Sequence, residues 1–218
     1  MAIAASTDHF LQAPTMFRIE SHLVEVPLEQ LRPTQMTVGF REVAEKRKSW
    51  GKLGGKARRD AMREELFPVV KGPGKSWYVL DHHHTAVALV HEKATAVQAG
   101  PVMDLSHLDA EAFWIFLDHH SWVHVYDAKG RRRPFTDMPA RFEELKDDPY
   151  RSLAGDVRDA GGYAKAEEPF LEFLWANHFR AHVPARLVKS DPKEARRVGL
   201  ALAAHKDAAH LPGWCGKR

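Results

Sequence analysis

The segment from residue 69 to residue 92 most constrains the fold, because it predicts two strands and a helix in immediate succession. Val69-Val70 and the apolar run 77–80 flank the segment Lys71–Lys75, which contains two glycines and a proline. Two short apolar runs separated in this way are typical of a β-hairpin. The apolar residues 86–92 then predict a short helix. The five residues between hairpin and helix, Asp81 to Thr85, therefore lie at a strand-to-helix junction.

Local signals predict further elements on both sides of this hairpin. Alternation over 17–26 indicates a strand, and 27–35 predicts a turn or short helix that stops at Pro33. Strand 96–103 contains Pro101, which favours an edge position. The predicted helices are 42–50 and 58–66, separated by a glycine loop carrying Lys52 and Lys56, and then 109–120 (capped by Ser106), 137–145, 152–159, 169–180 and 191–205.

These elements predict an α+β fold with a change of character near residue 106. We expect a flexible N-terminus over 1–16, a small mixed α/β module over 17–106, and a mostly helical region over 107–218 packed on that module. A chain of 218 residues buries enough surface to fold without a disulfide or a metal. The single Cys215 excludes a disulfide framework and a cysteine-rich zinc module.

Charge and hydropathy narrow the classes of partner. The formal net charge is +3, and the short basic runs 46–48 and 131–133 are typical of solvated faces rather than of a track for nucleic-acid phosphates. No run of about 18 apolar residues predicts a membrane span. No basic residue precedes Arg18, so the sequence favours a cytoplasmic protein, although a leader removed before Met1 is compatible with it.

The box Asp81–Thr85 is the strongest candidate site. At the carboxyl end of a strand and the start of a helix, free backbone N–H groups and the helix dipole favour an anion. His82, His83, His84 and Thr85 add side-chain donors for phosphate oxygens, and Asp81 can orient a hydroxyl or a Mg²⁺ ion. The glycine-rich phosphate loop with Gly-Lys-Ser/Thr does not occur in this sequence.

Two other interpretations of the histidine box stay open. The first is a zinc site, and two observations count against it. Three adjacent histidines cannot all reach one ion from regular structure, and the HExxH pair that binds zinc on a helix does not occur. Alternatively, the histidines cap the helix and pack in the core. The remaining cluster of His119, His120 and His124 has no assignable role, and neither has Cys215.

Three segments together resemble a known superfamily. Val26 to Gln35 resembles the opening strand and turn of ParB-like domains, and Leu80 to Ala86 is similar to the D-G-H-H-R box of the ParB/sulfiredoxin superfamily. The segments 38–43, 148–155 and 170–176 look like the ParB-like nuclease branch. The similarity covers about residues 20–182, and the order of the motifs makes it more specific than any one of them.

The resemblance implies a pocket more than a reaction. Members include CTP-binding partition clamps, ATP-dependent sulfiredoxins and free-serine kinases, and they place nucleotide phosphates with Mg²⁺ at the box that matches Asp81 to Thr85. The implied ligands are therefore Mg²⁺ and ATP, ADP or CTP, with a small-molecule substrate and with nucleic acid as a further possible partner; the oligomeric state is not indicated.

This sequence departs from the superfamily pattern in three ways. His82 replaces the glycine of the box and Thr85 replaces its arginine. The sulfiredoxin cysteine is absent from the box, which argues against sulfinic-acid reduction. The glutamate that serves as base in the serine kinases is matched by Gln35, which cannot accept a proton, and Glu42 is the nearest downstream acid.

We therefore expect a Mg²⁺-dependent phosphotransferase or nucleotide hydrolase. Asp81, His83 and Glu42 are the candidate catalytic residues, with Asp81 also the metal ligand; the candidate phosphate-binding residues are Arg32, Thr34, Gln35, His82, His84, Thr85, Arg151 and Ser152. The first alternative is a nuclease or a DNA-associated protein of the chromosome-partitioning type. That reading lacks a strongly basic helix-turn-helix region, since the second half carries aromatic residues at core-like helical spacings. The second alternative is a non-catalytic anion-binding module.

Overall fold

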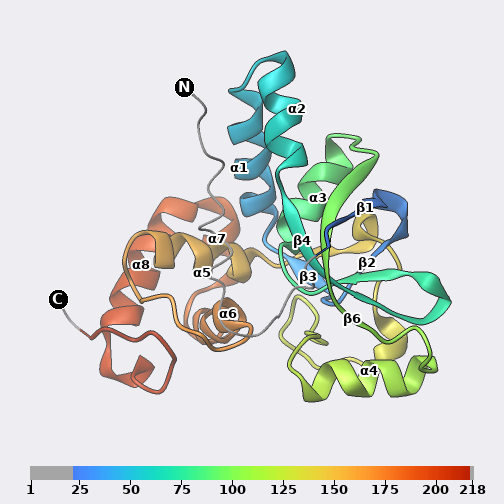
Figure 1. Ribbon diagram of the computed structural model, residues 1–218. Coiled ribbons are helices and arrows are strands. Elements are labelled where there is room, and N and C mark those ends of the chain that lie inside the picture. Colours follow the sequence, from blue (N-terminus) through green and yellow to red (C-terminus); the bar gives the residue numbers. More distant parts are fainter. Residues whose placement is uncertain (1–21, 217–218) are drawn as a thin grey trace.

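The sheet of the protein has five strands and lies beside a group of helices (Figure 1). The computed structural model describes residues 22–216. The strands run in the spatial order β1-β6-β4-β5-β2, with a separate two-stranded ribbon of β3 and β7. Their bounds are β1 Val24–Pro27, β2 Leu31–Pro33, β3 Thr37–Val38, β4 Leu66–Lys71, β5 Trp77–Val79, β6 Ala96–Asp104 and β7 Lys146–Asp147. The α+β class with a helical C-terminal half is confirmed, while the predicted flexible segment 1–16 lies outside the described residues.

The predicted hairpin forms the middle of the sheet. β4 and β5 pair antiparallel, with Val69 opposite Val79. β6 runs parallel to β4, and β2 runs parallel to β5 with Leu31 opposite Trp77. The chain leaves β5 through α3 (His83–His91), so the histidine box does lie where a strand ends and a helix begins.

The prediction that β6 is an edge strand is wrong, because β6 pairs with β1 on one side and with β4 on the other. β1 reaches only from Ala96 to Ala99 along β6. Pro101 therefore lies beyond the end of β1, in a part of β6 that pairs only with β4 among residues 22–216.

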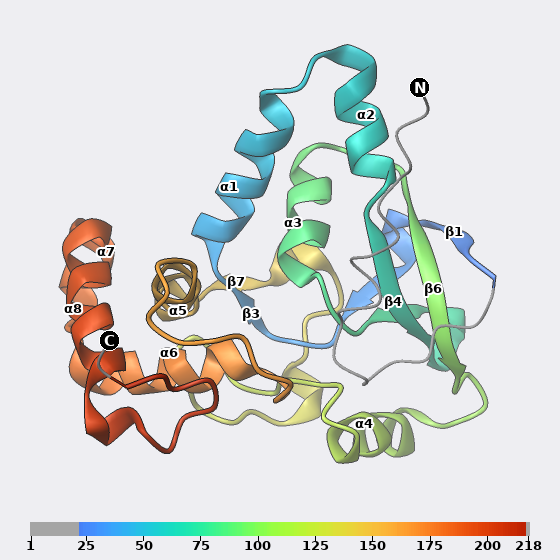
Figure 2. The same ribbon diagram turned by 60° about the vertical axis from the view of Figure 1, so that its left-hand side comes forward.

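Two helices project from the sheet as an arm (Figure 2). α1 spans Phe40–Gly51, as predicted from composition, and α2 spans Gly55–Arg63. α2 begins earlier than predicted, so Lys56 lies within the helix and not in the loop before it. It also ends earlier, because Leu66 already belongs to β4. No residue of α2 is buried, in contrast to α3, whose face packs in the core.

Residues 105–148 return over the sheet and belong with it structurally. α4 (Ala110–His119) is capped by Asp109, which accepts from the N–H of Ala112, and not by Ser106. The predicted helix 137–145 is wrong: this stretch forms only the short 3-10 turns η4 (Phe135–Asp137) and η5 (Phe142–Glu144). Pro139 cannot donate in a helix interior, and Phe142 instead turns into the core.

The C-terminal half is a helical bundle of α5 Pro149–Asp159, α6 Leu171–His182, α7 Ala185–Ser190 and α8 Pro192–Ala204. The caps of two of these helices follow sequence rules. Asp148 accepts from the first turn of α5, and Asp191, one residue before Pro192, accepts from Glu194 in α8. The sequence analysis missed α7, which is one short helix after Pro184.

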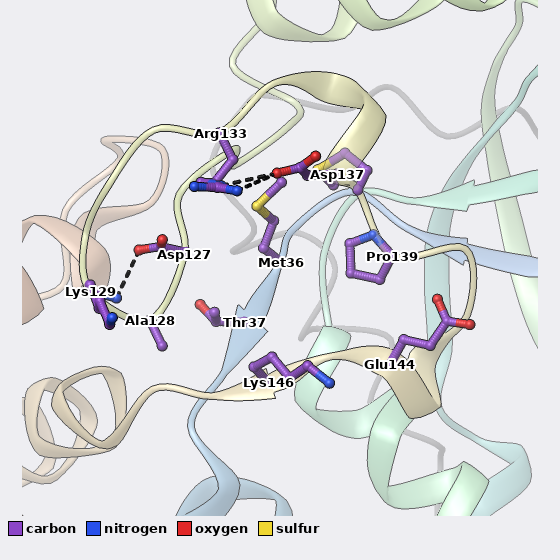
Figure 3. Close-up of a pocket in the computed structure, with 11 residues that line it drawn as sticks. Met36, Thr37, Asp127, Ala128, Lys129, Arg133, Asp137, Pro139, Glu144 and Lys146 are labelled. Carbon is purple, nitrogen blue, oxygen red and sulfur yellow. Dashed lines mark hydrogen bonds and ion pairs between the residues drawn. The ribbon is translucent and has the colours of Figure 1, made fainter.

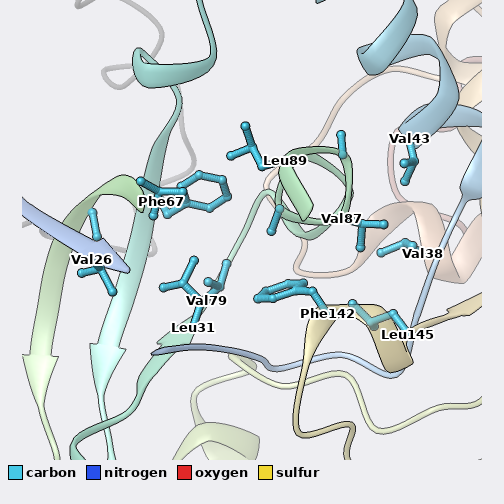
Figure 4. Close-up of a cluster of buried hydrophobic side chains, with 14 of the residues drawn as sticks. Val26, Leu31, Val38, Val43, Phe67, Val79, Val87, Leu89, Phe142 and Leu145 are labelled. Atoms are coloured by element: carbon cyan, nitrogen blue, oxygen red, sulfur yellow. The ribbon is translucent and has the colours of Figure 1, made fainter. Parts of the chain in front are cut away.

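Three apolar clusters hold these layers together. One packs α1 and α3 against the sheet, as Figure 4 shows for Phe67, Val87 and Phe142. A second lies under α4, on the other face of the hairpin, and a third is the centre of the helical bundle around Trp175 and Phe179. No helix among residues 22–216 is long and apolar enough to span a membrane.

Two positions on α6, one buried and one exposed, provide a test of this packing. Phe179 is 0% exposed and Leu174 is 42% exposed. We expect Phe179→Ala to lower the free energy of unfolding by about 3–5 kcal/mol, because it removes buried surface and leaves a cavity. Leu174→Ala should cost less than about 1 kcal/mol. Urea denaturation of both variants measures the difference, and equal losses would contradict the assigned face of α6.

Candidate active site

The backbone of the histidine box turns sharply before α3. His82 is the N-cap of α3 and adopts the left-handed conformation, with φ 68° and ψ 26°. Glycine adopts this conformation most easily, and glycine is the residue that the superfamily box carries at this position. His82 therefore keeps the backbone shape of the box although it changes the side chain.

The start of α3 presents free donors. The N–H of His82 donates to Oδ1 of the exposed Asp81 at 2.6 Å. The N–H groups of His83, His84 and Thr85 have no partner among the described residues, as expected in the first turn of a helix. Three N–H groups at the positive end of the helix dipole form a place suited to an anion.

His83 is committed to the protein interior. Its Nε2 accepts from the backbone N–H of Thr34 at 3.0 Å, and Thr34 Oγ1 donates to the carbonyl of Val79 at 2.7 Å. Burial lowers the pKa of His83 to about 3, so the ring is neutral, and the acceptor role of Nε2 assigns its proton to Nδ1. The three residues tie β2, β5 and α3 together, and they leave Nε2 occupied.

The structure places the other predicted phosphate ligands at different depths. Thr85 is buried within α3. Arg32 pairs in register with Tyr78, on the face of the hairpin that packs under α4, and its guanidinium donates to the carbonyls of Glu29 and Leu31. Arg32 is therefore not brought to the box. Gln35 is half-buried, and its Nε2 donates to the carbonyl of Thr37.

A partly buried ion network, with side chains 14–28% exposed, lies between α1, α5 and α6. Arg151 on α5 contacts Glu42 on α1 at 2.6 Å and Glu172 on α6 at 3.8 Å. Arg158, two turns further along α5, pairs with the other oxygen of Glu172. Glu42 and Arg151, both predicted as site residues, thus form an ion pair with each other. Glu172 and Arg158 complete the network, and the sequence analysis did not single them out.

Two glycines let α1 and α5 approach this closely. A Cβ on Gly39 would lie 2.5 Å from Oγ of Ser152, and a Cβ on Gly155 would lie 3.1 Å from Oε1 of Glu42. Ser152 is buried against the start of α1, where its Oγ accepts from the N–H of Arg41 at 3.4 Å. Ser152 therefore lies beside the Glu42–Arg151 pair.

The network gives its two carboxyls different proton affinities. Burial raises the pKa of Glu42, and the attraction of Arg151 only partly opposes this. Burial also acts to raise the pKa of Glu172, but Arg151 and Arg158 together outweigh it and hold that pKa below its ordinary value. Glu42 is therefore the carboxyl in this group that more readily takes up a proton.

The cations of the network also act on two nearby histidines. Burial and then the charge of Arg151 lower the pKa of His84 to about 3. His124, to which the sequence analysis gave no role, has a pKa of about 3 because of burial, Arg151 and Arg180. Both rings are therefore neutral at physiological pH.

His124 connects Thr34, the hydrogen-bond partner of His83, to α6. Its N–H donates to the carbonyl of Thr34 at 2.8 Å, and its ring stacks on Phe173 with the centroids 3.8 Å apart. Its Nδ1 is buried with no hydrogen-bond partner among the described residues. No local sequence signal identifies His124. Glu172, which the sequence analysis also missed, lies within the segment 170–176 that carried part of the family resemblance.

The comparisons with known proteins agree with this geometry. A family model described as "Putative ParB-like nuclease" matches residues 24–181, which include the sheet, the box and the ion network. The chain belongs to this ParB-like family. The crystal structure of protein Atu1540 from Agrobacterium tumefaciens is similar to it, with a TM-score of 0.83 and 41% identity over 90% of this chain and 100% of that chain. No curated protein matches the chain.

The donors of the box are compatible with a Mg²⁺ ion that is held together with phosphates. Asp81 is the one carboxylate in the box, and the described residues contain no group of three or more His, Cys, Asp or Glu side chains that could hold a metal. Mg²⁺ is commonly held by one or two carboxylates together with substrate phosphates and water. Asp81 would hold such an ion, which would neutralise phosphate charge during the reaction.

The neutral histidines predict how stability depends on pH. The folded protein keeps His124 neutral, whereas the unfolded chain protonates it below about pH 6.5. Acid therefore favours the unfolded state, and the stability contributed by a histidine with a folded pKa of about 3 is lost as the pH falls from about 6.5 toward 3.

We expect His124→Phe to make the free energy of unfolding less dependent on pH, by about 1.4 kcal/mol per pH unit between pH 4 and 6. Phenylalanine keeps the stacking on Phe173 and removes the unpartnered Nδ1. Urea denaturation over this pH range measures the effect, with His119→Phe, an exposed position on α4, as the control. Identical pH profiles for wild type and His124→Phe would contradict the neutral buried ring.

Proposed function

We propose that this ParB-like protein binds a nucleotide through its phosphates at the start of α3 and catalyses Mg²⁺-dependent hydrolysis or transfer of a phosphoryl group. The observation that carries the proposal is the left-handed His82, followed by three unpaired N–H groups at a helix start. The side chains of His83 and Thr85 point into the core, so the exposed part of this helix start is its backbone together with Asp81.

The surrounding groups suit phosphoryl chemistry. Asp81 is exposed next to the start of α3, where a carboxylate can hold the Mg²⁺ of a nucleotide complex. His84 is neutral, so one ring nitrogen donates and the other accepts. Glu42 has a raised proton affinity and is the acid we assign to the proton-accepting role that Gln35 cannot fill. Arg151 is saturated by two carboxylates, which supports a role in orienting Glu42 rather than in binding phosphate directly.

A nucleotide panel tests this proposal. We expect ATP, ADP or CTP with Mg²⁺ to raise the melting temperature, by about 5–10 °C at a hundredfold excess over Kd for a chain of this size. Asp81→Asn should remove the Mg²⁺-dependent part of the shift and the release of phosphate, and Glu29→Gln, an exposed carboxyl outside the box, should retain both. A melting temperature that no nucleotide changes would contradict the proposal, and binding without phosphate release would favour the non-catalytic module.

A nuclease is the second candidate function, and the projecting arm is the observation that favours it. Lys48, Lys52, Arg59 and Arg63 on α1, α2 and their loop are exposed and form no ion pair within the described residues. α2 packs against the core through the partly buried Ala61 and Met62, and its exposed basic face is not explained by that packing. An exposed helical arm with free cations suits the phosphate backbone of a nucleic acid.

If the protein is a nuclease, we expect the logarithm of its DNA affinity to fall linearly with the logarithm of the salt concentration. Lys52→Glu and Arg59→Glu should each lower the affinity for every DNA sequence. Replacement of either residue by a neutral one should reduce the slope of log affinity against log salt concentration by about 1. Fluorescence anisotropy with a labelled duplex and a labelled single strand measures this, with Lys193→Glu on the distant helix α8 as a control of equal charge change. Retention of full affinity in both arm variants would exclude the arm as the DNA surface.

A further inference from the structure

The two arginines of α5 are each shared by two carboxylates. Arg151 contacts Glu42 at 2.6 Å and Glu172 at 3.8 Å, and Arg158 contacts both Glu172 and Asp159. Every other arginine that forms an ion pair within residues 22–216 contacts one carboxylate only. The ion network is therefore a place where carboxylates compete for a cation.

Arg133 shows the ordinary arrangement for comparison. Its guanidinium donates two hydrogen bonds to the single carboxylate of Asp137, at the wall of the cavity formed by β3, β7 and the segment 127–144 (Figure 3). These two side chains are 47% and 37% exposed, so water screens their charges. Arg151 is 14% exposed and its two partners are 20% and 19% exposed. Competition for Arg151 therefore affects the charge state of its partners more strongly than an exposed pair would.

The two competitors differ in one contact. Glu42 and Glu172 each lie in the first turn of a helix, so the helix dipoles favour both carboxylates alike. Arg151 offers Nη1 to Glu42 and Nη2 to Glu172. Arg158 pairs with Glu172 and forms no ion pair with Glu42 within the described residues. Glu172 is therefore the carboxylate that stays ionised, and its charge opposes ionisation of Glu42 from the other end of the Arg151 guanidinium.

The pKa of Glu42 has the direction that this arrangement requires. Burial raises it most, Arg151 lowers it, and the charge of Glu172 raises it again. The other charged or titratable groups on α1 and on the helix α3 packed against it are neutral, exposed or paired elsewhere. They are His84, which is neutral, the exposed Glu45, Arg41, which pairs with Asp156 at 2.7 Å, and Lys46, which pairs with Glu65 at 2.5 Å.

We propose that Glu172 is a positioning residue for Glu42, because by sharing Arg151 it keeps Glu42 from becoming a fully paired and weakly basic carboxylate. The role of Glu42 in a reaction rests on the proposed function. There the oxygen of water or of an acceptor hydroxyl forms a bond to phosphorus as the bond to the leaving oxygen breaks. Glu42 takes the proton of the attacking oxygen and later releases it to solvent. The effect of Glu172 on Glu42 rests on the contacts alone.

An NMR titration of the Glu42 carboxyl carbon tests this effect in the full-length protein without nucleotide. The signal is assigned by its loss in Glu42→Gln. Glu172→Gln keeps the size of the side chain and removes its charge, so we expect the midpoint of the titration to fall by about 1 pH unit. Arg158→Gln leaves the charge of Glu172 less compensated, so the midpoint should rise by a similar amount.

Two controls accompany these variants. Arg158→Lys keeps the charge, and Glu111→Gln removes an exposed carboxyl on α4, so both should titrate as wild type does. Loss of structure would move the midpoint toward the ordinary value of about 4.3 in every variant, and it therefore cannot produce the rise expected for Arg158→Gln. Midpoints that stay unchanged, or that move in the same direction in Glu172→Gln and Arg158→Gln, would overturn the proposal.

The pH profile of phosphate release connects this effect to the reaction. A base must be unprotonated to act, so kcat/KM falls on the acid side of the midpoint of Glu42. We expect this acid limb to move to lower pH in Glu172→Gln and to higher pH in Arg158→Gln. An acid limb that does not follow the NMR midpoints would refute the role of Glu172 in the reaction. If wild type releases no phosphate while the midpoints move in opposite directions, the proposed function fails and the control of Glu42 by Glu172 stands.

Discussion

The ion network centred on Arg151 joins the sheet module to the helical bundle. Arg151 lies on α5 and is held between Glu42 of α1 and Glu172 of α6. Removing three charges from water is costly, and their mutual attraction offsets that cost only with close, well-oriented contacts. Gly39 and Gly155 allow this closeness, because a side chain at either position would press on Ser152 or on Glu42. Removing Arg151 would leave the Glu42 carboxylate unpaired, while Glu172 would keep its ion pair with Arg158; replacing the whole group by apolar residues would cost far less.

The same cations set the charge state of the residues around the box. Burial, and then the charge of Arg151, keep His84 and His124 neutral, so these two rings carry no charge across the physiological pH range. Glu42 is the exception, since burial raises its proton affinity while its position beside Arg151 is fixed. The proton-accepting role proposed for Glu42 rests on this raised proton affinity.

The parts of this protein that sequence predicts well depend on neighbours in the chain. The hairpin, the start of α3 and the cap of α8 at Asp191 rest on turn, cap and periodicity signals within a few residues. The errors arise where distant contacts decide. Pro101 indicates an edge strand. The part of β6 that lies beside β1, however, depends on how long β1 is. The direction of Arg32 follows from its parallel partner Tyr78, and the occupied Nε2 of His83 follows from Thr34, 49 residues away in sequence.

The three consecutive histidines show why side-chain composition alone misleads at this site. His82 is left-handed and half-exposed, His83 points into the core toward Thr34, and His84 lies near Arg151, so the three rings diverge. They cannot converge on one ion, and one of them is used to fix β2 to α3. What the box offers a ligand is chiefly its backbone: the turn at His82 and the N–H groups that follow it. The same reasoning accounts for histidine in place of the superfamily glycine, because the fold constrains the conformation at this position more tightly than the side chain. In the proposed function, recognition of a phosphate rests on the helix start and on Asp81, and a change at residue 82 that preserves the left-handed turn would preserve the proposed site.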